Sequence, residues 1–89
     1  MPAGYSLEQH VPHPFSPGTN IKFKVASLKF IKLVVYDLLG REVRTLVNEA
    51  LQAGTYSVRF DAGDLPSGIY FYQLRTDNFS ETKKLILLK

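Results

Sequence analysis

Short stretches in which apolar and polar residues alternate strictly recur along the chain, and this pattern constrains the fold more than any other feature. The clearest examples are NIKFKV at residues 20–25 and TYSVRF at 55–60, and further runs are FIKLVVYD (30–37), GIYFYQLR (68–75) and FSETKKLILLK (79–89). A period of two is that of a strand with one buried face. Because no segment keeps a helical period over more than about one turn, the alternation predicts an all-β protein.

Turn signals separate these runs. DLLGRE places Asp37 at a turn start and Gly40 at a position suited to a positive φ, and DAGDLPSG cannot continue a strand. Asp77 and Asn78, which both tolerate a positive φ, predict a tight hairpin. REVRTLVN (41–48) is a weaker strand whose apolar residues fall out of phase, which predicts a bulge or bend.

Together with a short edge strand in YSLEQ, these runs predict an immunoglobulin-like antiparallel β-sandwich of about seven short strands. LPSGIY supports this fold, because a tyrosine near the start of a late strand bonds back to the preceding corner in such sandwiches. Tyr70 is the candidate for this tyrosine corner. The alternative is that Tyr70 is an ordinary half-buried strand residue.

The last two strands carry more apolar residues than one buried face needs. If Tyr70 faces the core, Phe71 faces outward, and either Ile86 with Leu88 or Leu85 with Leu87 joins it on the outer face. A monomer seldom leaves a large contiguous apolar patch bare, so a partner, another part of the parent protein, or a second copy of the chain is expected to cover it. The competing interpretation is that loops or YSLEQ cover these residues.

Composition narrows the function classes. The 89 residues suit one domain, expected at 5–89, with 1–4 as a linker or cloning remnant. Without cysteine, hydrophobic packing must stabilise the fold. His10 and His13 lack acidic or thiolate partners nearby, and no catalytic constellation stands out, so we expect no enzyme, metal or cofactor. A net charge of +3, spread along the chain, does not predict nucleic-acid binding.

Nearly the whole chain, from Tyr5 to Lys89, resembles a known family. The motifs YSLEQ, P-x-P-F-x-P, T-x-I-x-F, VYDLLGREVRTLVNE, AGTYSVRFDA and LPSGIYFYQLRTDNFSETKKLILLK follow one another in the family's order. They are similar to the type A C-terminal sorting domain of proteins exported by the type IX (Por) secretion system of Bacteroidetes-type bacteria. The immunoglobulin-like domain of flagellar hook-capping proteins shares part of this pattern but lacks its ending.

The resemblance implies that the domain functions as a sorting signal for secretion. The family's domain is the last module of a secreted or cell-surface protein, which crosses the inner membrane of a Gram-negative bacterium on a signal peptide. The outer-membrane export machinery then recognises the domain, and a sortase-like protease commonly removes it from the upstream cargo domain. The resemblance assigns recognition to the terminal strand, here Lys83, Lys84, Leu85, Ile86, Leu87, Leu88 and Lys89, and structural turns to Gly40, Gly54 and Gly68.

The proline-rich segment departs from the family pattern. Asparagines usually surround its prolines, whereas here His10, His13 and Ser16 occupy the corresponding region and Phe15 is kept. The prolines stiffen the segment, so we expect Phe15 to act as a lid over one end of the core. Two alternatives to sorting remain: a carbohydrate-binding module that uses the outward aromatics Phe71 and Tyr36, and a passive structural spacer.

Overall fold

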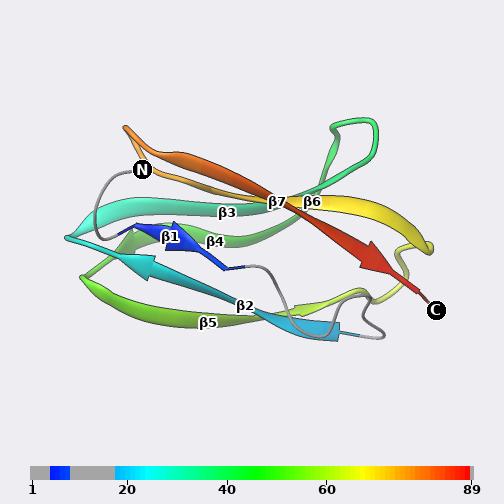
Figure 1. Ribbon diagram of the computed structural model, residues 1–89, viewed down its shortest axis with the longest axis horizontal. Coiled ribbons are helices and arrows are strands. Elements are labelled where there is room, and N and C mark those ends of the chain that lie inside the picture. Colours follow the sequence, from blue (N-terminus) through cyan, green and yellow to red (C-terminus); the bar gives the residue numbers. More distant parts are fainter. Residues whose placement is uncertain (1–4, 9–17, 89) are drawn as a thin grey trace.

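The computed structural model describes residues 5–8 and 18–88, which form seven strands packed as two antiparallel sheets (Figure 1). Within these residues there is no helix, which confirms the all-β sandwich. The strands are β1 (Ser6–Leu7), β2 (Gly18–Val25), β3 (Lys29–Asp37), β4 (Glu42–Leu51), β5 (Gly54–Asp61), β6 (Gly68–Arg75) and β7 (Ser80–Leu87). Phe15, His10, His13 and Lys89 lie outside the described residues.

The smaller sheet has the strand order β1-β2-β5. β1 pairs with β2 through Ser6 and Lys24, so the edge strand predicted in YSLEQ is confirmed. The backbone nitrogen of Leu7 donates to Glu81 Oε1 at 3.1 Å, which ties β1 to β7 of the other sheet. One lateral side of the sandwich is therefore bridged by a hydrogen bond between the two sheets.

The larger sheet has the order β4-β3-β6-β7. The pairing of β3 with β4 shifts register between Leu33 and Val34 and again between Val35 and Tyr36. These shifts confirm the irregularity predicted from the out-of-phase apolar residues of β4, because an extra residue in a ladder reverses the faces that follow it.

The core lies between the sheets and consists of the inward residues of both. Its least exposed members are Ile21, Phe23, Val25, Ile31, Leu33, Val35, Phe60, Tyr72, Leu74, Leu85 and Leu87. Val34 is also only 2% exposed, although alternation places it on the outer face of β3. Its neighbour in register, Gln73, takes part in a polar chain on that face: Tyr36 donates to Gln73 at 3.5 Å, and Gln73 donates to Thr82 at 3.2 Å.

The hairpin between β6 and β7 forms where the sequence predicts it, with Thr76 N donating to Phe79 O at 2.8 Å. Asp77 and Asn78 tolerate a positive φ but do not adopt one, since among the described residues only glycines have a positive φ. Thr76 Oγ1 instead accepts a hydrogen bond from Asn78 N at 3.3 Å. This local side-chain bond stabilises the turn without a left-handed residue.

The sandwich is elongated, 37 × 23 × 22 Å, and its two ends differ. At one end Tyr5 stacks on Phe79, with ring centroids 5.7 Å apart, and bonds Ser27 at 3.2 Å, so the chain enters beside the β2–β3 and β6–β7 turns. The β3–β4 turn, the corner before β6 and the end of β7 lie at the other end (Figure 1). We call these the entry end and the far end.

Candidate functional site

The terminal strand β7 has two faces with different environments. Leu85 and Leu87 are completely buried in the core, whereas Ile86 is half-buried and Leu88 is 52% exposed. Ile86 lies opposite Ile69 of β6, as expected for a hairpin. Of the two alternatives for the outer face, the structure therefore selects Ile86 with Leu88.

The lysines at the start of the predicted recognition segment also differ in position. Lys83 Nζ forms an ion pair with Glu81 Oε2 at 3.3 Å, and the other oxygen of Glu81 accepts from the backbone of β1. Lys84 lies opposite Phe71 in the ladder, on the outer face. The segment thus divides between core, sheet edge and outer surface rather than forming one surface.

The aromatic residues on the outer face are less exposed than the sequence suggests. Phe71 and Tyr36 are register partners on neighbouring strands, and both are half-buried. The sequence interpretation missed Phe30, which is 58% exposed at the other end of β3 from Tyr36. Phe30 stands at the start of the strand next to Lys29, and nothing in that local sequence indicates that the packed neighbours leave its ring exposed.

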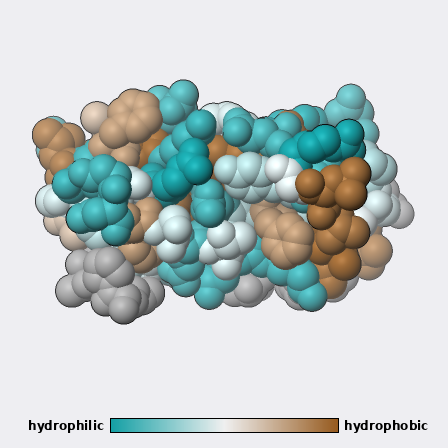
Figure 2. Space-filling model, turned by 90° about the horizontal axis from the view of Figure 1, so that it is seen from above, coloured by the Kyte–Doolittle hydropathy of each residue, from teal (hydrophilic) through white to brown (hydrophobic). Residues whose placement is uncertain are grey.

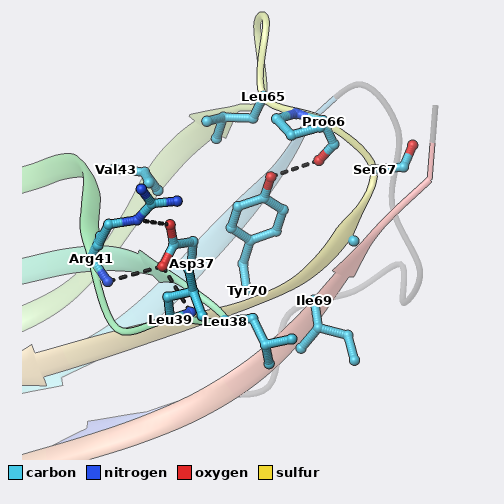
Figure 3. Close-up of a pocket in the computed structure, with 11 residues that line it drawn as sticks. Asp37, Leu38, Leu39, Arg41, Val43, Leu65, Pro66, Ser67, Ile69 and Tyr70 are labelled. Carbon is cyan, nitrogen blue, oxygen red and sulfur yellow. Dashed lines mark hydrogen bonds and ion pairs between the residues drawn. The ribbon is translucent and has the colours of Figure 1, made fainter.

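A pocket of about 400 Å³ opens at the far end between the β3–β4 turn and the corner before β6 (Figure 3). The turn supplies Asp37, Leu38, Leu39 and Arg41. The remaining lining residues come from the β4 start, the corner and β6: Val43, Leu65, Pro66, Ser67, Gly68, Ile69 and Tyr70. The motifs DLLGR and LPSGIY, far apart in sequence, meet here.

Asp37 organises the β3–β4 turn. Its Oδ1 accepts from the backbone nitrogens of Leu39 and Arg41, both at 2.9 Å, and its Oδ2 accepts from Arg41 Nε at 2.8 Å. The hydrogen bond from the Arg41 backbone, with further help from its guanidinium, lowers the pKa of Asp37. Gly40 completes the turn at φ +85°, a conformation that residues with a Cβ rarely adopt. The positive φ predicted for Gly40 is confirmed.

Tyr70 forms the inner wall of the pocket. Its ring is buried, and its hydroxyl donates to Pro66 O at 2.6 Å, which is the back-bond of a tyrosine corner (Figure 3). Burial, and secondarily the charge of Asp37, raises the pKa of the Tyr70 hydroxyl. The corner is thereby held against the sheet, and Gly68 follows it as the first residue of β6. Gly54, the first residue of β5, lies away from the pocket, opposite the last residue of β2.

Four large apolar side chains at the far end remain exposed to solvent: Leu38 (65%), Leu39 (78%), Ile69 (38%) and Leu88 (52%). We call them the apolar rim. Figure 2 shows hydrophobic side chains gathered at this end of the outer face. The sequence interpretation included Leu88 but missed both turn leucines, because Asp37 and Gly40 already explained the turn. The sequence could have indicated this exposure, because the two leucines occupy turn positions at which polar residues are usual.

The charged residues that line the pocket are already paired. The charges that line the pocket, Asp37 and Arg41, form an ion pair with each other. In the part of the chain that the structure describes, no three His, Asp or Glu side chains gather as metal ligands would. Nor do the described segments include a helix with the length and apolar character of a membrane span.

A search of curated proteins finds no relative. The family model of the secretion system C-terminal sorting domain matches residues 11–88, which include β2 to β7 and the whole pocket. Most of the chain is covered, so it belongs to the family of C-terminal sorting domains of the type IX (Por) secretion system.

Proposed function

We propose that the chain is the recognition module of a larger exported protein and that outer-membrane components of the type IX machinery bind it directly. In this proposal the parent reaches the periplasm on a signal peptide and crosses the outer membrane to the cell surface. A sortase-like protease then separates the cargo from the domain. The observation that carries the proposal is the family match over residues 11–88.

The arrangement of the domain supports this role. A cargo domain joined before Tyr5 would attach at the entry end, beside the turns that contact Tyr5. Ile86 of β7 and Leu88, which directly follows the strand, lie toward the far end. We therefore assign recognition to the outward part of the segment from Lys83 to Lys89, while Leu85 and Leu87 hold that segment in the fold.

Export of a reporter tests the proposal. The complete chain is fused to the C-terminal end of a fluorescent reporter with a signal peptide, in a bacterium that carries this secretion system. We expect the reporter at the cell surface or in the medium, and we expect the reporter without the chain to stay in the periplasm. Retention of both fusions in the periplasm, or equal export from a strain whose outer-membrane pore is deleted, would contradict the proposal.

The mass of the exported reporter tests the cleavage step separately. We expect the surface form to lack the domain and the periplasmic form to keep it. A surface form that retains the domain contradicts cleavage but leaves sorting intact.

The carbohydrate-binding alternative has less support, because Phe71 and Tyr36, the neighbouring aromatic pair on which it relies, are both half-buried. The exposed ring of Phe30 lies at the other end of β3 from Tyr36. The alternative predicts retardation of the chain in polysaccharide gels, lost on Phe71→Ala.

A further inference from the structure

The exposure of the apolar rim is built into the fold. Leu38 and Leu39 stand on a turn closed by Gly40 N donating to Asp37 O at 3.0 Å and by Asp37 N donating to Arg41 O at 2.9 Å. The three side-chain bonds of Asp37 described above reinforce this turn. A turn with so many local bonds needs no leucine for its own stability. The exposure of the two leucines to water therefore gives up the free energy that burying them would gain, and the stability of the turn does not explain why they are there.

The pocket beside the rim has the size and chemistry of a site for an apolar group. Its volume of about 400 Å³ falls within the ~300–1,000 Å³ range of ligand pockets. The Asp37 carboxylate is bound to Arg41, and the Tyr70 hydroxyl is bound to Pro66 O. Leu38, Leu39 and Ile69 form its apolar lip (Figure 3). Because the charges and the buried hydroxyl already have partners, a neutral apolar group matches the pocket better than an ion or a sugar.

The location of the pocket indicates what kind of molecule occupies it. The pocket lies at the far end, away from Tyr5, so a cargo domain joined there would leave it open. A bilayer binds amphipathic helices and clusters of Lys and Arg. Among the described residues the rim stands on turns and strands, and the Arg41 guanidinium beside the pocket is paired with Asp37. A hollow with an apolar lip instead matches the way in which a protein partner inserts one anchor side chain.

We propose that the pocket and the apolar rim together bind an apolar anchor side chain of a protein of the export machinery. The sorting determinant is then composite: the β3–β4 turn, the corner before β6, and Ile86 with Leu88 form one surface. This inference rests on the proposed sorting function and adds a site to it. Its occupant is an aromatic or long aliphatic residue on the partner protein.

A pair of matched double variants tests the inference in the reporter fusion of the complete chain. Leu38→Ser with Leu39→Ser removes half of the rim. Leu28→Ser with Phe30→Ser is the control, because these side chains are 65% and 58% exposed and lie outside the pocket. We expect the rim variant to lower surface delivery about tenfold, the change produced by losing roughly 1.4 kcal/mol of binding energy at a hot spot. The control should stay within about twofold, as expected for exposed residues outside an interface.

Thermal unfolding of the two variant chains shows whether a loss of export comes from weaker binding or from a loss of folding. Both should melt within a few degrees of the parent chain, because exposed substitutions change stability by about 0.5 kcal/mol or less. If the rim variant is folded and exported as well as the control, the inference is wrong while the sorting function stands. If the unsubstituted chain is not exported, the sorting function itself fails.

A photoreactive amino acid in place of Leu39, compared with one in place of Leu28, identifies the class of partner. The inference expects a cross-link from position 39 to an outer-membrane protein that disappears when the pore component is deleted, with no such product from position 28. A cross-link from position 39 only to lipid, or only to a second copy of the chain, would overturn it. The same cross-link from both positions would also overturn it, because the contact would not be specific to the pocket.

Discussion

Asp37 is the residue on which the far end depends most directly. Its carboxylate accepts three hydrogen bonds within five residues of chain and so shapes the turn that holds Leu38 and Leu39 outward. The same bonds favour the charged form, which is why the pKa of Asp37 lies below its ordinary value. In the sequence Asp37 is explained as an ordinary turn residue, whereas in the structure it also positions the leucines of the candidate site.

The lowered pKa predicts an acid-dependent loss of stability. Because the folded-state pKa lies below the unfolded value of about 3.9, the contribution of Asp37 is fully present above that value and is lost as the pH falls through the folded pKa. Asp37→Asn keeps an oxygen acceptor but removes the charge. We expect the variant to be less stable than the parent at pH 7 and the difference to shrink below about pH 4.

Urea unfolding at a series of pH values measures this difference. Asp64→Asn is the matched control, since Asp64 pairs with Arg44 but its side chain is 96% exposed. Exposed pairs contribute at most about 1 kcal/mol. A free-energy difference for Asp37→Asn that stays constant from pH 7 to pH 3 would show that the charge of Asp37 is not what stabilises the turn.

At the scale of the element, β7 combines two roles on its two faces. Leu85 and Leu87 are completely buried, while Leu88 is 52% exposed and Ile86 packs beside Ile69. A deletion of the terminal residues would therefore remove core and surface together. Such a deletion cannot separate loss of recognition from loss of folding, whereas single substitutions on one face can.

Substitutions on the two faces of β7 should separate stability from export. Leu85→Ala is expected to lower the free energy of unfolding by about 2–5 kcal/mol, because it leaves a cavity in the core. Leu88→Ser should change it by about 0.5 kcal/mol or less and still reduce surface delivery. Chemical denaturation and reporter export measure the two effects. Equal destabilisation by both substitutions would refute this division of faces.

At the scale of the whole molecule, the ends of the sandwich differ. The entry end carries Tyr5, stacked on Phe79, and the far end carries the pocket and the apolar rim. With a long axis of 37 Å, a cargo at one end and a partner at the other need not compete for the same surface. In the proposed function, a partner can therefore bind the far end while a cargo protein is attached at the entry end.

An uncovered apolar rim predicts weak self-association of the isolated chain. Four partly exposed side chains offer less surface than the roughly 800 Å² per partner of a stable complex, so the dissociation constant should be about 1 mM or weaker. Leu38→Ser with Leu39→Ser should weaken it further. Sedimentation equilibrium over a concentration series measures this. Association that is equally strong in the double variant would place the contact elsewhere, for example at an exposed strand edge.

The strands, most turns and the alternation of faces could be predicted from the sequence, because a period of two and the φ preference of Gly40 are local properties of the chain. The motifs along the chain also identified the family. Only the packed fold shows that Leu85 and Leu87 face the core, that Phe71 is half-buried, and that DLLGR and LPSGIY enclose one pocket. The reason is physical: both faces of β7 are apolar, so its orientation follows from pairing with β6 and packing against the other sheet, and a pocket between distant segments exists only once those sheets have packed.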